Sequence, residues 1–234
     1  MSTQKLHIQL TIAGFPVEAA VAVPAQPAPR HLLLPILQNL TDIVVQVAEH
    51  QAGIEGFNVS CKKGCDACCR QMVPISPAEA YHLAAVVESL APEHQRRVMK
   101  RFDRAERLLA QSGLLARLGQ RHTMTEGEQH QLDIDYFQAQ IPCPFLERHA
   151  CSIHSRRPLA CREFLVTSPA IHCRHPTAER VRQLRLPAKV STALVTQDTA
   201  GWLPLILTRQ FLAEQPEPTD GDLPHVLRAI LAAL

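Results

Sequence analysis

The stretch CKKGCDACC, Cys61 to Cys69, places four of the chain's eight cysteines within nine residues. Cys65 and Cys68 form a C-x2-C pair, a spacing that lets a tight turn direct two thiolates at one ion. Gly64 directly precedes this pair and fits the sharp backbone turn that such a loop needs. Adjacent side chains usually diverge, so Cys68 and Cys69 are expected to ligate two ions or two irons of one cluster, or one of them only packs.

A second group of cysteines follows a long cysteine-free segment, in CPFLERHACSIHSRRPLACREF (residues 143–164) and shortly after it. Its members are Cys143, Cys151, Cys161 and Cys173. Prolines at positions 142, 144 and 158 restrict the unliganded loops and lower the entropy lost when a site closes. The pattern is bipartite, and a helical hairpin from Ser76 to about Ser112 would return the chain to the first group.

Three kinds of chemistry compete for these cysteines. The first residues, MSTQKLHIQLTIAGF, lack the apolar core of a signal peptide, so we expect a cytoplasmic protein whose thiols stay reduced. This expectation disfavours a disulfide framework. A redox C-x2-C motif would open a helix after a strand, whereas this pair precedes the proline-broken VPISPAEA. Metal binding uses most of the cysteines at once, and it is the interpretation that we favour.

Charge and hydropathy bear on the possible partners. The net charge of +2 gives no general argument for nucleic acid. The segment 92–112 carries an arginine-rich face, which we interpret as solvated because aromatic stacking residues are missing and the acidic segment 125–135 could pair with it. The apolar stretch 31–50 is interrupted by Pro35 and Asp42, so no membrane span is expected. A metal ion or cluster and a protein partner are the candidates that remain.

The predicted fold class is mainly α with an N-terminal β-hairpin and a loop-built, cysteine-rich metal site between helices. Alternation over residues 6–12 and 17–23 predicts the hairpin. Helical spacing predicts a helix that stops near Gly53, and Ser76 with Glu79 forms a capping box for the next helix. We expect a hairpin and helix extension at 1–53, a cysteine-cluster domain at 54–176 and a mostly helical extension at 177–234.

Further elements are expected along the second half of the chain. In segment 92–112 the residues Val98, Phe102, Ala105 and Leu109 share one face of a helix. A short helix is expected at SRRPLACREF (155–164). The pattern also predicts a helix over 176–186, a strand over 188–195, and helices over 202–215 and 223–234.

Together these motifs resemble the YkgJ-like cysteine-cluster proteins. The resemblance rests on CKKGCDACC followed by VPISPAEA, then CPFL, CSIHSRRPLACR and a final Cys173. That family carries a domain described as zinc- or iron-chelating and named for its CxxCxxCC motif. The resemblance implies that the cluster contains Cys61, Cys65, Cys68, Cys69, Cys143, Cys151 and Cys161, with Cys173 as a further member.

Two departures from the family pattern concern single residues. The opening spacing is C-x3-C instead of C-x2-C, and His154 replaces an aromatic residue. We expect His154 to be a surface residue or a hydrogen-bond partner more often than a ligand, because the cysteines already suffice. Arg157 and Arg162 flank Cys161, and two roles stay open for them: they offset thiolate charge and donate to sulfur, or they pair with Glu163.

The identity of the metal determines the function that the sequence supports. Zinc would make the site structural, whereas an iron–sulfur cluster would also open redox and radical chemistry. We favour iron–sulfur because more thiolates are present than one zinc needs. The alternative is a methyltransferase-related enzyme or its accessory protein, since flagellin lysine methylases contain a similar cysteine-cluster region. The chain has no glycine-rich fingerprint and no set of residues that stands out as catalytic.

Overall fold

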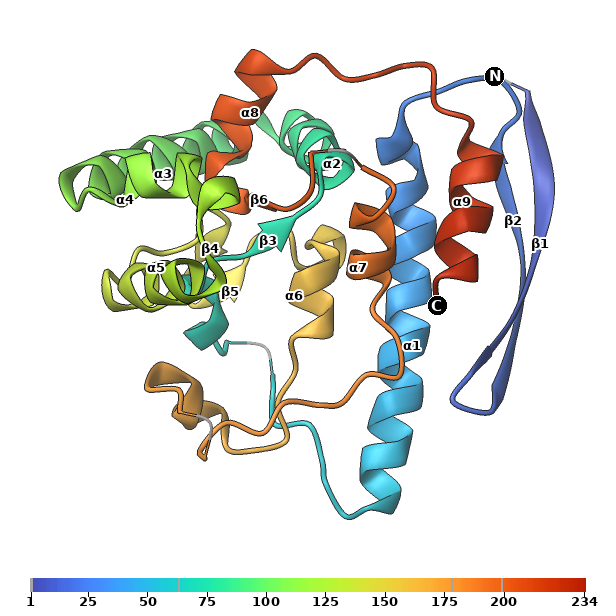
Figure 1. Ribbon diagram of the computed structural model, residues 1–234, viewed down its shortest axis with the longest axis horizontal. Helices are drawn as coiled ribbons and strands as arrows, with labels where there is room; N and C mark the ends of the chain where they lie inside the picture. Colours follow the sequence, from blue (N-terminus) through green and yellow to red (C-terminus); the bar gives the residue numbers. More distant parts are fainter. Residues whose placement is uncertain (1, 63, 178, 199) are drawn as a thin grey trace.

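The computed structural model describes residues 2–62, 64–177, 179–198 and 200–234. The described part is mainly helical and begins with an antiparallel β-hairpin, as the sequence predicts (Figure 1). The helices are α1 (Leu34–Ile54), α2 (Pro77–Glu88), α3 (Pro92–Gln111), α4 (Leu114–Gly119), α5 (Glu126–Gln138), α6 (Leu159–Glu163), α7 (Val190–Val195), α8 (Thr208–Glu214) and α9 (Leu223–Ala232). The strands are β1 (Thr3–Ile12), β2 (Phe15–Pro24), β3 (Pro74–Ile75), β4 (Leu146–Glu147), β5 (Ala150–Cys151) and β6 (Leu203–Pro204). Short 3-10 helices are η1 (Arg30–Leu33), η2 (Ala67–Arg70), η3 (Arg121–Thr123), η4 (His154–Arg156), η5 (Ala170–Arg174) and η6 (Leu205–Leu207).

The hairpin forms because its turn suits the twist of its strands. β1 pairs with β2 in a register that places Ile12 opposite Phe15. The two turn residues, Ala13 and Gly14, both have positive φ, 49° and 86°, which is the backbone shape of a two-residue hairpin turn. One face of the hairpin is buried through Ile12 and Val23, and Figure 1 shows α9 between the hairpin and α1.

Helix α1 begins after η1 and ends one residue beyond Gly53, close to the predicted stop. Pro35 occupies its first turn and Asp42 lies on its accessible side, so neither residue interrupts it. Contrary to our expectation for this stretch, the continuous helix Arg30–Ile54 is long and apolar enough to cross a membrane by length and composition. Half of the most apolar 18-residue stretch of this helix is buried inside the protein. The absence of a membrane partner stays a prediction.

The second helical group confirms the predicted caps and the predicted buried face. Ser76 and Glu79 form a capping box at the start of α2. Helix α3 buries the four residues that the spacing indicated, Val98, Phe102, Ala105 and Leu109. The acidic residues Asp133 and Asp135 on α5 pair with Arg121 and Arg117, and not with the arginine-rich face of α3.

Between residues 176 and 195 the structure differs from the predicted helix and strand. The described residues of the predicted helix over 176–186 are non-helical, and Gln183 instead forms a β-bridge with Val166. The predicted strand over 188–195 is helix α7, because Glu163 accepts hydrogen bonds from the N–H and hydroxyl groups of Ser191 at the first turn. The predicted helix over 202–215 is helical only from Leu205, since its first residues pair with β3 as strand β6.

The core is divided among several apolar clusters. The largest joins the hairpin, α1, α7 and α9, and includes Leu159 of α6 and Ala78 of α2. A second cluster joins α2, α3 and η6 around Phe145, and the side chains of Cys143 and Cys151 pack against it. A small third cluster contains Cys173, with Cys61 and Cys65 at its edge. Five of the eight cysteines therefore pack in or against these last two clusters. The division of the chain at residues 53 and 176 stays a prediction.

Candidate metal centre

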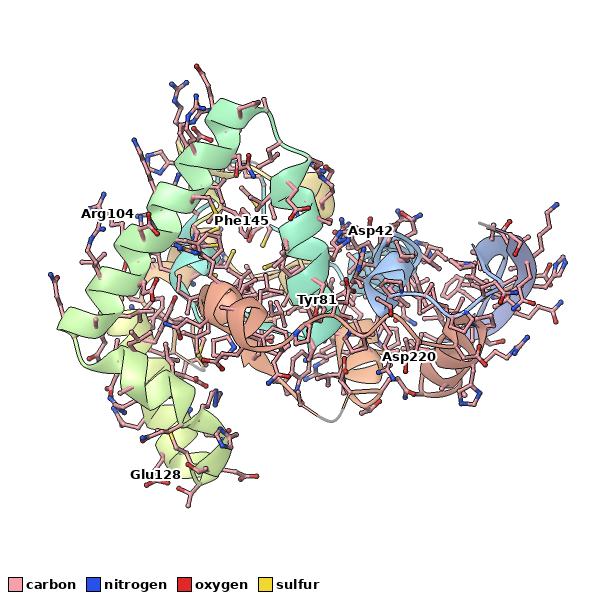
Figure 2. The ribbon with its side chains drawn as sticks, turned by 90° about the horizontal axis from the view of Figure 1, so that it is seen from above. Asp42, Tyr81, Arg104, Glu128, Phe145 and Asp220 are labelled. Atoms are coloured by element: carbon pink, nitrogen blue, oxygen red, sulfur yellow. The ribbon has the colours of Figure 1, made fainter. Side chains whose placement is uncertain are left out.

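The two halves of the cysteine pattern meet in the structure. The backbone N–H of Cys143 donates to the carbonyl of Cys69 at 2.7 Å, so the chain that leaves the first group through α2 to α5 returns directly to it. Cys151 lies opposite Leu146 in the β4–β5 hairpin, and Cys161 lies on α6. In Figure 2 sulfur atoms gather near Phe145, between α2 and α3.

Electrostatic interactions link Cys68 to thiols of both cysteine groups. On one side of it are Cys61 and Cys173, on which the charges of Cys65 and Cys68 act. On the other side are Cys69, Cys143, Cys151 and Cys161. None of the eight cysteines forms a disulfide. The predicted site residues thus lie together, with Cys68 between two thiol groups; their assignment as ligands stays a prediction.

Backbone N–H groups are directed at several of the sulfur atoms. The N–H of Val166 donates to Cys61 Sγ at 3.4 Å. The backbone at Phe145 and Ile153 interacts in the same way with the thiols two residues earlier, Cys143 and Cys151. Hydrogen bonds of this kind favour the thiolate form and tune the properties of sulfur-ligated metal sites.

The vicinal pair Cys68 and Cys69 is asymmetric. The thiol of Cys69 donates to the sulfur of Cys68, which lowers the pKa of Cys68 to about 7 and raises the pKa of Cys69. Burial raises the pKa of Cys143 to about 12 and also raises that of Cys161. Of these four cysteines, Cys68 is the exposed one and the one that most readily supplies a thiolate.

The donor set fits a thiophilic metal, and the side chains would have to turn to bind it. Soft thiolates select zinc, cuprous copper and iron–sulfur clusters. Among the described residues no three His, Cys, Asp or Glu side chains are so placed that they could hold one ion without movement. Rotation about χ1 is available to the half-buried cysteines in loops, so the framework fits the group and the rotamers would adjust on binding.

Arg157 is a cation that acts on several of the thiols. Burial raises the pKa values of Cys61 and Cys151, and the charge of Arg157 opposes that rise. After the hydrogen bond from Cys69, the same charge helps to lower the pKa of Cys68. Arg101 acts in the same way on Cys143. The buried Nε of Arg157 has no hydrogen-bond partner among the described residues, and its backbone carbonyl is held by Gln38 of α1 at 3.2 Å. This arrangement supports the charge-offsetting role that the sequence left open for Arg157.

Arg162 has neither of the two roles considered for it. Its guanidinium makes a bidentate ion pair with Asp42 of α1, at 2.8 and 2.7 Å, and also donates to the carbonyls of Ser155 and Arg157. Glu163 is instead bound to Ser191 of α7. These contacts anchor the short helix α6, which carries Cys161, to its neighbours.

Glu79 is more than a capping residue. One carboxylate oxygen accepts the N–H of Ser76 at 2.9 Å, and the other accepts the N–H of Leu159, the first residue of α6, at 2.8 Å. The side chain is buried, with a residue exposure of 1%, and burial raises its pKa to about 7. Glu79 therefore fixes the start of α6 relative to α2.

A buried carboxylate that sequence reasoning missed, Asp66, holds the first cysteine loop in place. Its side chain is 2% exposed and contacts His149 Nδ1 at 2.8 Å and Arg174 at 3.1 Å. The hydrogen bond from His149 is the main reason why the pKa of Asp66 is lowered. An aspartate inside a C-x2-C loop carries no distinctive sequence signal, since its partners lie far along the chain.

The histidines near the cysteines have hydrogen-bonding roles or lie at the surface. His149 binds Asp66, and His172 contacts the carbonyl of Arg180 at 3.0 Å. His154 is exposed and hydrogen-bonds with Arg157, in agreement with the expected surface or hydrogen-bonding position. His175 is exposed.

Comparison with protein families places the cysteine region in a known family. Residues 60–184, more than half of the chain, match the family model CxxCxxCC, described as "putative zinc- or iron-chelating domain". The chain belongs to this family. The matched CxxCxxCC region contains all eight cysteines, together with Asp66 and Glu79. Neither curated proteins nor solved structures gave a match.

Proposed function

We propose that this CxxCxxCC protein binds an iron–sulfur cluster through its bipartite cysteine set. The observation that carries the proposal is the meeting of the two cysteine groups around Cys68, fastened by the backbone bond between Cys143 and Cys69. A single zinc ion takes four ligands, and eight neighbouring thiols exceed that number. Vicinal cysteines suit a site with more than one metal, because their side chains can serve different irons.

The charges around the thiols support the same proposal. Several thiolates on a divalent ion or an iron–sulfur core carry net negative charge. Arg157 offsets part of that charge, and the N–H groups directed at Cys61, Cys143 and Cys151 offset more of it. When bound, such a cluster would supply electron transfer, or a structural tie between the two loops.

Zinc is the second candidate, because the family description names zinc as well as iron. A zinc site would use four of the thiols and leave the others to pack. The methyltransferase-related alternative receives no support from the fold, since every sheet in the described residues has two strands and offers no doubly wound cofactor site.

The test is metal and sulfide analysis of protein purified without oxygen, together with a visible absorption spectrum. We expect a brown protein that contains iron and acid-labile sulfide. The variants Cys68→Ser and Cys161→Ser should lose most of the iron. The control Lys62→Ala should retain it, because Lys62 is exposed between two cysteines and offers no thiol.

A colourless protein with stoichiometric zinc would refute the iron–sulfur proposal and leave a structural zinc site. Metal-free protein in which all eight thiols react in the folded state would refute metal binding through this set. Equal metal content in the cysteine variants and in Lys62→Ala would show that the bound metal lies elsewhere.

A further inference from the structure

A cationic pocket lies beside the cysteine set and includes Cys143 in its wall. It has a volume of about 310 Å³ and is bounded by α3, the first cysteine loop and the β4–β5 hairpin. Its cationic side chains are Arg70, Arg101, Arg104 and Arg148, and His149 also lines it. Ala105 and Leu108 of α3 form an apolar part of the wall, and Cys143 forms another part. We define these residues as the arginine pocket.

The arginine pocket contains more positive charge than its carboxylate neutralises. Asp66 is the one acidic residue among the pocket's described lining residues, and it already contacts His149, Arg70 and Arg174. Glu147 lies outside the pocket lining and pairs with Arg101 at 3.2 Å. Among the residues that the structure describes, Arg104 and Arg148 have no ion-pair partner.

The turn of the β4–β5 hairpin, which lines this pocket, has a strained backbone. Arg148 and His149 form the two-residue turn between β4 and β5, and both have positive φ, 48° and 63°. This conformation normally favours glycine, and non-glycine residues that adopt it are over-represented at functional sites. The hydrogen bond between His149 and the buried Asp66 holds the turn in place. This position of the turn puts Arg148 on the pocket wall.

We propose that the arginine pocket binds a small multivalent oxyanion, a phosphate or a polycarboxylate. Guanidinium groups from separate elements, α3 and the β4–β5 turn, converge on one space and present planar pairs of donors that match such oxygens. The volume of about 310 Å³ lies at the lower end of small-molecule sites, so it suits a compact anion and not a polymer. Part of the basic face of α3, Arg101 and the exposed Arg104, thus borders the pocket.

The experiment is calorimetric titration of the full chain with inorganic phosphate and, separately, with citrate at low ionic strength. The test variant is the double substitution Arg104→Gln and Arg148→Gln, which removes the two guanidinium groups without an ion-pair partner. The matched control is Arg107→Gln, because Arg107 is exposed on the same helix but does not line the pocket. Both variants should keep the wild-type metal content, since neither touches a cysteine.

We expect one anion to bind per chain, at least 10-fold more weakly in the double variant and unchanged in Arg107→Gln. Preference for phosphate or for citrate identifies the kind of oxyanion. The proposal would be overturned if neither phosphate nor citrate binds, or if the double variant and Arg107→Gln weaken anion binding equally. The result is independent of the metal proposal, because binding is measured both before and after metal is removed with a chelator.

Discussion

Replacement of Glu79 by alanine is the sharpest test of how the metal centre is held. The carboxylate bridges two buried N–H groups, of Ser76 and Leu159, at 2.9 and 2.8 Å. Alanine would leave both donors without a partner in a place where water has little access, since Ser76 and Leu159 are fully buried. A buried backbone N–H without a partner costs about 1–3 kcal/mol, so the substitution should cost about 2–6 kcal/mol of unfolding free energy.

The chain offers a matched control in a second capping box. At the start of α5, Glu128 accepts the N–H of Thr125 at 2.8 Å, with the same local geometry as Ser76 and Glu79. That box is exposed, so water can replace the lost acceptor. Glu128→Ala should therefore cost only a small fraction of the free energy lost in Glu79→Ala.

The assay is urea denaturation of both variants in the presence of a chelator, so that metal does not contribute to stability. Equal losses of unfolding free energy in Glu79→Ala and Glu128→Ala would refute the reasoning, because neither the burial of the first box nor its bond to Leu159 would then contribute to stability. A second readout follows α6: metal affinity should fall in Glu79→Ala and stay unchanged in Glu128→Ala, because Glu79 binds the start of the helix that carries Cys161 and Glu128 does not.

Four further outcomes are expected. Burial raises the pKa of Glu79 from 4.5 to about 7, so between these pH values the folded protein keeps a proton that the unfolded chain releases. This contribution to stability is fully present below about pH 4.5 and is lost as the pH rises through 7. Denaturation at several pH values should therefore show a flatter dependence of unfolding free energy on pH for Glu79→Gln. Phe145→Ala should cost about 3–5 kcal/mol, because the buried ring packs edge-on against Phe102, while Phe15→Ala at an exposed position should cost far less in the same denaturation assay. Arg162→Gln should cost about 2–3 kcal/mol through its lost charged hydrogen bonds, as measured by urea midpoints. Arg97→Gln should cost less than about 1 kcal/mol, because the Arg97 side chain is 42% exposed in its ion pair with Glu147. Gly64→Ala should destabilise the protein by about 1 kcal/mol or more because φ is 93°, whereas Gly127→Ala inside α5 should stabilise it by about 0.5–1 kcal/mol, which thermal unfolding can check.

Elements set by local chemistry could be predicted from the sequence. The buried face of α3 follows from helical spacing alone, and the start of α2 follows from the Ser76–Glu79 capping box. The turn at Gly64 has the positive φ that its position before Cys65 suggested. In each case the residues that decide the structure lie within a few positions of one another, so a linear pattern contains the necessary information.

Elements set by contacts between distant residues could not be predicted from the sequence. Helix α7 reads as a strand because Val190 and its neighbours favour β structure, yet Glu163 caps its first turn from 28 positions away. The segment before it reads as a helix, but its Gln183 bridges to Val166 and its Leu184 packs against α1. For the candidate site the cysteines themselves could be recognised, whereas Asp66 and Asp42 could not, since their partners lie on other elements.

The anchoring of α6 bears on how the metal centre relates to the fold. A helix of five residues does not form alone in water, because nucleation costs more than so few hydrogen bonds return. Here Glu79 binds one end of it, Glu163 ties the other end to α7, and Arg162 joins it to α1. Cys161 is thus positioned by buried polar contacts that need no metal, and Cys143 is positioned by its bond to Cys69. Zinc-finger peptides lack such a framework and fold only with the ion. In this protein most of the entropy of bringing the cysteine loops together is offset by the surrounding core, so metal binding has only to order side chains at a site whose backbone already exists.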